Sequence, residues 1–187
     1  MREIAILVLA LLLAPSLACN RVETTPQAAA ASTPAGAPDQ ALRLQLSLDD
    51  RFRPARREGK AIVMRLPDLP DVELWLVVGR DPVSGPVPGR AALVQKALAF
   101  LEPIHGEVQV STTEQGDDLL AFDGPKPDGN RTLHSYNWML IRPGADSILR
   151  ADLSLRMPDR WVAEPAMKGL VEHVSERLAT ASFEPGA

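Results

Sequence analysis

The chain has 187 residues, a length that suits one domain with extensions. Hydrophobic residues make up 45% of the chain, enough for a core, whereas 17 prolines and only 4% aromatic residues indicate that a sizeable stretch stays unfolded. The formal net charge of -4 argues against nucleic acid as the main partner.

The first element is a short apolar run with a positive start. Arg2 precedes residues 4–14, which carry no charge, and Pro15 ends the run. Spanning a bilayer takes about 20 apolar residues, so this run is too short to cross one comfortably. A charged start, a short apolar stretch and small residues before a cut are typical of a secretory signal. Residues 1–18 are therefore predicted to be removed by cleavage after Ala18.

Cys19 is the single cysteine of the chain and follows this cleavage position directly. One cysteine excludes an internal disulfide and a cysteine-based zinc site. Ala18-Cys19 resembles the end of the lipobox of bacterial lipoproteins, although Ser16 and Leu17 stand where Leu and a small residue are usual. The resemblance implies that Cys19 carries acyl chains such as palmitate, each buried methylene contributing about 0.8 kcal/mol to membrane anchoring. Cleavage by an ordinary signal peptidase, reading Ser16-Leu17-Ala18 as small-x-small, is the alternative.

The residues after the cysteine predict a location and a tether. Asn20 follows Cys19, and bacterial lipoproteins kept at the inner membrane mostly carry Asp at this place. The resemblance thus implies an outer-membrane lipoprotein that faces the periplasm or the cell surface. Residues 21–40 are mostly Ala, Thr, Pro and Ser and show no apolar period. Such a segment cannot offset its conformational entropy by burial, so residues 19–41 are predicted to be a lipidated cysteine and a disordered tether.

A folded domain is predicted from residue 42. Residues 42–48 alternate leucine with mostly polar side chains, which is typical of a half-buried strand. Residues 61–66 and 72–78 are two further predicted strands, separated by a turn. Residues 81–89 contain three prolines and two glycines and are predicted to be a loop. Residues 90–104 place apolar side chains at helical spacing and predict the first helix.

The second half of the domain is predicted to form several strands followed by a closing helix. Four strands are predicted, at residues 107–113, 119–123, 132–142 and 148–156. Turn-forming residues at 127–130 and 142–145 favour antiparallel neighbours. A second helix is predicted at 164–181, with Phe183 packing just beyond it. Residues 185–187 are left as a tail.

This order predicts a single α+β domain at 42–184, with an antiparallel sheet flanked by two helices. It resembles the PsbP-like fold, named after an extrinsic protein of photosystem II and similar to that of some bacterial lipoproteins and small secretion-associated chaperones. The likeness depends on the mid-chain helix after a strand pair, on a hairpin through Tyr136-Asn137-Trp138 and Ala151-Asp152-Leu153, and on a closing helix that runs into Phe183. Members share no catalytic residues, so the resemblance implies binding and assembly roles.

Residue types that carry chemistry are few, and no catalytic, metal or cofactor site is predicted. The chain has three histidines, none at metal-ligand spacing with another. His134 and Ser135 are neighbours in a predicted strand, so they point to opposite faces and cannot pair directly. The acidic pairs Asp49-Asp50 and Asp117-Asp118 are predicted to be solvated turns, since calcium sites need a denser oxygen set.

A basic cluster and three tryptophans are the remaining candidates. The cluster consists of Arg51, Arg53, Arg56, Arg57 and Lys60. It favours contact with lipid phosphates or an acidic partner, or else a solvated hairpin loop whose charges protect a sheet edge. Trp75 is predicted to lie in the core, Trp138 in the core or at an interface, and Trp161 against the last helix or at an interface. Arg53, Arg56, Arg57 and Trp161 are the predicted partner contacts.

Three functions follow from these features. The first is a membrane-anchored, non-enzymatic accessory that binds another protein of the bacterial cell envelope. The second is a binder or sensor of a small apolar ligand held between sheet and helix. The third is a hydrolase, which needs Ser135 or Ser154 to meet a distant histidine and acid.

Overall fold

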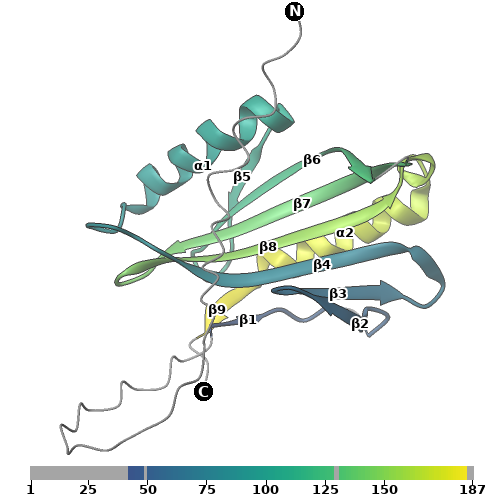
Figure 1. Cartoon of the computed structure of the whole chain (residues 1–187), viewed down its shortest axis with the longest axis horizontal. Helices are drawn as coiled ribbons and strands as arrows, with labels where there is room; N and C mark the ends of the chain where they lie inside the picture. Colours follow the sequence, from purple (N-terminus) through teal and green to yellow (C-terminus); the bar gives the residue numbers. More distant parts are fainter. Residues whose placement is uncertain (1–41, 49, 129–130, 185–187) are drawn as a thin grey trace, which may run out of the picture. The chain divides into compact units, whose positions relative to one another are not determined.

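The order of elements confirms the predicted α+β fold (Figure 1). The computed structural model describes residues 42–48, 50–128 and 131–184, all within one unit, residues 37–187. The predicted signal segment, Cys19, the tether and the tail at 185–187 lie outside these described residues. Across the described ranges, no helix combines the length and the apolar character that a membrane crossing requires.

Two helices and nine strands form the described part of the chain. In order they are β1 (Arg43–Gln45), β2 (Arg53–Glu58), β3 (Ala61–Leu66), β4 (Leu69–Pro82), α1 (Arg90–His105), β5 (Gln109–Thr112), β6 (Asp118–Asp128), β7 (Arg131–Pro143), β8 (Ser147–Pro158), a short 3-10 helix η1 (Asp159–Trp161), α2 (Pro165–Ala179) and β9 (Ser182–Glu184).

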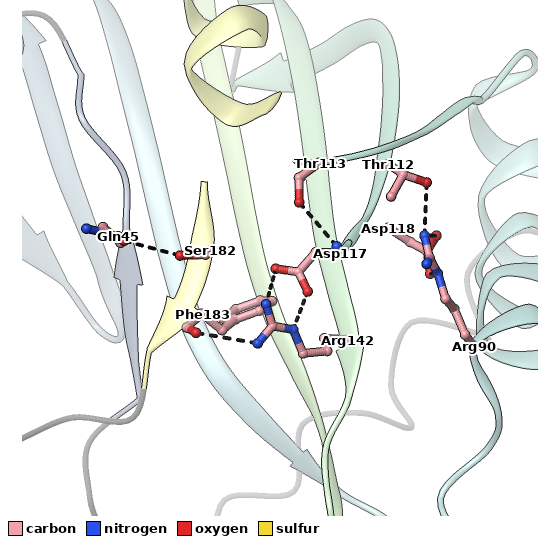
Figure 2. Close-up of polar contacts among 9 residues, drawn as sticks. All are labelled: Gln45, Arg90, Thr112, Thr113, Asp117, Asp118, Arg142, Ser182 and Phe183. Carbon is pink, nitrogen blue, oxygen red and sulfur yellow. Dashed lines mark hydrogen bonds and ion pairs between the residues drawn. The ribbon is translucent and has the colours of Figure 1, made fainter. Parts of the chain in front are cut away.

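Seven of the strands form one sheet in the order β2-β3-β4-β8-β7-β6-β5, and every neighbouring pair is antiparallel. The remaining two, β1 and β9, pair with each other and bring the start and the end of the domain together. A hydroxyl–amide hydrogen bond of 3.3 Å from Ser182 to Gln45 joins this pair (Figure 2). The predicted antiparallel sheet with two helices is therefore confirmed.

Several predicted strand limits were wrong, including that of β6, which was predicted to end at residue 123 and runs to Asp128, and one strand was not predicted. The strand predicted at 42–48 is only β1, because its partner β9 has just three residues. β2 was not predicted as a strand, since all of its side chains are exposed and its pairing with β3 alone defines it. β4 runs beyond 72–78 into the predicted loop, because β8 pairs with it as far as Pro82.

One face of the large sheet carries the main core and packs against α2. Alternate strand residues such as Leu74, Leu153 and Leu155 point to this face and are at most 1% exposed. They meet Val174 and Leu178 of α2, which are fully buried and lie one helical turn apart. Phe183 of β9 joins the same cluster, as predicted.

The opposite face is covered only in part. Leu93 and Leu101 of α1 pack against Leu120, Met139 and Ile141, which come from β6 and β7. The rest of this face, on β3, β4 and β8, mixes charged side chains such as Arg65, Glu73 and Arg156 with apolar ones, of which Val63 is fully buried. The sheet therefore has one apolar face, which packs against α2. On the other face, α1 packs against β6 and β7, and the half formed by β3, β4 and β8 lies outside this contact.

Candidate functional site

The uncovered half of the sheet brings together side chains that are far apart in the sequence. Register places Arg65, Glu73, Arg156 and Ser135 opposite one another on β3, β4, β8 and β7. Alternate residues share a face, so this row points away from α2. Above it lies a hollow of about 1000 Å³, whose lining includes Arg56, Glu73, Trp75, Lys126, Arg156 and Arg160. We call it the charged hollow.

Glu73 is the centre of the polar contacts in the charged hollow. Arg56 donates to both of its carboxylate oxygens, at 2.8 and 3.1 Å. Arg65 donates two hydrogen bonds to Oε1, at 2.9 and 2.5 Å, and the Trp75 indole N–H donates to Oε2 at 3.0 Å. Hydrogen bonds from Arg56, then from Arg65 and Trp75, outweigh burial and lower the pKa of Glu73 from 4.5 to about 2. Glu73 is thus held ionised and fixes three neighbouring side chains.

The prediction that Trp75 lies in the core was wrong. Leu74 occupies the core face of β4, so the next residue along the strand points to the opposite face and is half-buried there. The guanidinium of Arg156 lies 3.8 Å from the Trp75 ring centroid, and that of Arg56 lies 5.4 Å away. Both distances suit cation–π contacts. Trp75 therefore forms part of the lining of the charged hollow.

Arg156 and Lys126 differ from the other cations of the charged hollow. The Arg156 Nε–H donates to the Ser154 hydroxyl at 3.3 Å. Among the described residues, neither Arg156 nor Lys126 forms an ion pair with a carboxylate. Burial lowers the pKa of both groups, and the Arg156 charge lowers that of Lys126 further. Glu73, Glu58 and Asp128 act on Arg156 in the opposite direction, as Asp128 does on Lys126, but none of these carboxylates forms an ion pair with either half-buried cation.

The predicted basic cluster does not form one patch. Arg56 pairs in register with Val63 and enters the charged hollow, whereas Arg57 pairs with Ile62 and so points to the other face. Arg53 is exposed opposite Arg65. Arg53, Arg56 and Arg57 lie on β2, an edge strand where charged side chains discourage pairing with a second chain, whereas Arg51 and Lys60 lie in the turns beside it.

The other two tryptophans lie outside the charged hollow. Trp138 is 3% exposed, and its indole N–H donates to the Ser175 hydroxyl at 3.2 Å, so it belongs to the core. Trp161, in η1, is half-buried against the main core, with the Arg160 guanidinium 5.4 Å from its ring centroid.

His134 and Ser135 point to opposite faces, as predicted. His134 Nε2 lies 2.9 Å from Asp123 Oδ2, and its ring is tilted against Tyr136. The Ser135 and Ser154 hydroxyls lie 2.8 Å apart, and Ser135 also donates to the Asn137 amide oxygen at 2.9 Å. Histidine is not among the hydrogen-bond partners of either serine in the described chain. The same residues contain no group of three potential metal ligands.

The prediction that Asp117 and Asp118 form a solvated turn was wrong. They are 1% and 5% exposed. Figure 2 shows each of them facing an arginine from another element. Arg142 of β7 pairs with both oxygens of Asp117, at 2.8 Å for the Nη2–Oδ2 contact, and Arg90 at the start of α1 pairs with Asp118 at 2.7 Å. Their partners come from distant elements, so the local sequence gave no sign of burial. The Asp118 pair holds the first residue of α1 against β6. Asp50 is exposed, and Asp49 lies outside the described residues.

A second hollow bears on the small-ligand hypothesis. It measures about 260 Å³ and lies at the edge of the packing between sheet and helix, where Tyr136 and Trp138 meet Val171 and Ser175 of α2. Pockets for small molecules usually measure about 300–1,000 Å³ and are mostly apolar. This hollow is therefore smaller than a usual ligand pocket.

Comparison with known proteins identifies similar folds. Neither a protein-family model nor a curated protein matches the sequence. The structure of LpqN from Mycobacterium tuberculosis, which is involved in cell envelope biogenesis, is similar with a TM-score of 0.53 and 16% identity, over 80% of this chain and 87% of LpqN. A structure from Bacteroides thetaiotaomicron is similar with a TM-score of 0.52 and 11% identity, over 75% of this chain, which spans 45% of that protein. At such identities the likeness shows a shared fold.

Proposed function

We propose that this chain is a lipid-anchored, non-enzymatic protein of the bacterial cell envelope that binds another envelope protein through the charged hollow. The observation that carries the proposal is the half of a sheet face that lies beyond α1 and holds a fixed array of charged and aromatic side chains. The similar fold of LpqN, a protein involved in cell envelope biogenesis, supports the setting.

The chemistry of the charged hollow suits protein binding. Arginine and tryptophan are the residues most often responsible for affinity at protein interfaces. Here Glu73 holds Arg56, Arg65 and Trp75 in place through five hydrogen bonds. Because these side chains are already ordered, this protein loses less conformational entropy when a partner binds them.

Acylated Cys19 supplies the membrane attachment in this proposal, and Asn20 directs the protein to the outer membrane. The 22 residues at 20–41 would act as the tether. A flexible chain of that length has a root-mean-square reach of about 25 Å, or roughly 5–6 Å times the square root of the residue number. The charged hollow could then meet partners on or near the membrane surface.

Mass spectrometry of the mature N-terminus and membrane fractionation test the anchor. The expected mature chain begins at Cys19 with acyl chains attached and sediments with the outer membrane. A Cys19→Ala variant should move to the soluble fraction. An unmodified Cys19 in a freely soluble mature chain would refute the anchor.

Photo-crosslinking in intact cells tests the binding face. A photoreactive residue is placed at Thr132 or Asp71, which are exposed and line the charged hollow, and a matched control at Glu172, exposed on α2. We expect the first two positions to give a defined protein adduct and the control to give none. Equal adducts from all three positions, or none from the hollow, would refute binding through this face.

A further inference from the structure

Resting on the proposed function, we infer that Arg156 and Lys126 form a binding site for a carboxylate group of the partner polypeptide. The inference names the chemistry that one part of the charged hollow recognises. It depends on three observations: the pairing of the charges, the position of the two cations and the charge of the surrounding lining.

The first observation is the uneven pairing of cations in the charged hollow. Arg56 and Arg65 both pair with Glu73, Arg56 also pairs with Glu58 at 3.3 Å, and Arg160 lies 3.8 Å from Asp71. Arg156 and Lys126 have no such contact among the described residues, although both are half-buried. Partly buried charges are costly when unpaired, so an incoming anion gains more at these two groups than at the paired arginines.

The second observation is that both cations lie on one face of the sheet and line the charged hollow. Arg156 pairs in register with Ser135, which pairs with Gly124 on the next strand. Lys126 is two residues beyond Gly124 on β6 and so points to the same face. Gly124 and the buried Ser135 add little bulk beside Arg156, whereas Leu133 lies directly opposite Lys126. Both charged groups border the charged hollow, which a small anionic group can enter. The Ser154 hydroxyl, already hydrogen-bonded to Arg156, helps to hold the guanidinium.

The third observation favours a singly charged group. The lining contains five cations, Arg56, Arg65, Lys126, Arg156 and Arg160, and five carboxylates, Glu58, Asp71, Glu73, Asp128 and Asp159. This balance creates no broad positive field of the kind that attracts an anionic membrane. A phosphate with nearly two charges would also be repelled by the nearby carboxylates. A carboxylate carries one charge and accepts two parallel hydrogen bonds from a guanidinium.

Titration of the mature, full chain in neutral detergent tests the inference. The probe is a capped five-residue peptide with one central Glu, and its twin carries Gln at the same place. Binding is followed by the nuclear magnetic resonance signal of the Trp75 indole N–H, assigned with a Trp75→Phe variant, because Arg156 stacks on that ring. We expect the Glu peptide to bind about tenfold or more tightly than its Gln twin.

Variants locate the site. Arg156→Gln and Lys126→Gln should each weaken binding of the Glu peptide about tenfold, whereas Arg177→Gln, at an exposed arginine of α2 outside the charged hollow, should leave it within about twofold. Circular dichroism checks that each variant is folded. If the Arg156 variant does not fold, the Lys126 variant alone tests the site.

Other outcomes separate the alternatives. Equal binding of the Gln twin, or unchanged binding in the Lys126 variant, overturns the carboxylate site. Tighter binding of inorganic phosphate, or of phosphatidylglycerol vesicles over phosphatidylcholine vesicles, overturns it in favour of a phosphate. If the Glu peptide does not bind but crosslinks persist at Thr132 and Asp71, only this inference is overturned. If peptide binding and the crosslinks are both absent, the proposed function is overturned as well.

Discussion

Replacement of Glu73 by Gln tests whether the charged hollow is held together as described. The pKa of Glu73 falls from 4.5 to about 2, a difference of about 2.5 that corresponds to about 3.4 kcal/mol at roughly 1.36 kcal/mol per pKa unit. The paired side chains of Arg56 and Arg65 are 37% and 48% exposed, so solvent screening reduces this upper limit. We expect Glu73→Gln to lower the free energy of unfolding by about 1–2 kcal/mol at pH 7.

The effect should depend on pH in one direction. A carboxyl group whose pKa is lower in the folded state stabilises the protein above its unfolded pKa of 4.5, and this contribution is lost as the pH falls through about 2. The difference between wild type and Glu73→Gln should therefore be full at pH 7 and shrink between pH 4.5 and pH 2.

Urea unfolding followed by far-ultraviolet circular dichroism measures both effects. The matched control is Asp71→Asn, which removes a carboxylate from the same hollow where both partners of the ion pair are more than half exposed. It should change the free energy of unfolding by less than about 0.5 kcal/mol. Equal stability of Glu73→Gln and wild type at pH 7, or a difference that is unchanged at pH 2, would refute the reasoning.

Three further predictions concern the rest of the domain. Asp117→Asn leaves Arg142 without its buried partner and should cost about 2–4 kcal/mol in urea unfolding, while Asp117→Asn with Arg142→Met should cost less than the sum of the single changes. Leu155→Ala opens a cavity at a fully buried position and should lower the free energy of unfolding by about 2–5 kcal/mol in the same assay. An unchanged free energy of unfolding would contradict the placement of Leu155 in the core. Arg57→Gln, on an exposed edge strand, should shift thermal unfolding by no more than about 1–2 °C, and a larger shift would indicate an undetected contact.

The parts of the fold that follow local periodicity could be predicted from the sequence. The closing helix places Leu170, Val174 and Leu178 on one face, and these residues pack in the core. β2 could not be predicted in this way, because none of its side chains is buried and its partner strand alone defines it. Burial of Asp117 was equally hidden, since its partner Arg142 is 25 residues away.

The candidate site was only partly predictable. Arg56 was recognised from a dense run of charges, but Glu73, Lys126 and Arg156 lie on separate strands and come together only through register. One signal was available: polar or aromatic residues alternate with leucines in β4 and in β8. Because alternate residues of a strand point to opposite faces, Trp75 and Arg156 must lie on the face opposite the leucines.

Hydroxyl-radical footprinting of the chain in native outer membranes and of the purified chain tests most directly whether the charged hollow is covered by a partner. Trp75 reports on the hollow, and Phe100 of α1, which is 54% exposed, reports on a face outside it. We predict that oxidation of Trp75 falls in the native membrane while that of Phe100 is unchanged. Unchanged oxidation of Trp75, with or without protection of Phe100, would contradict the account.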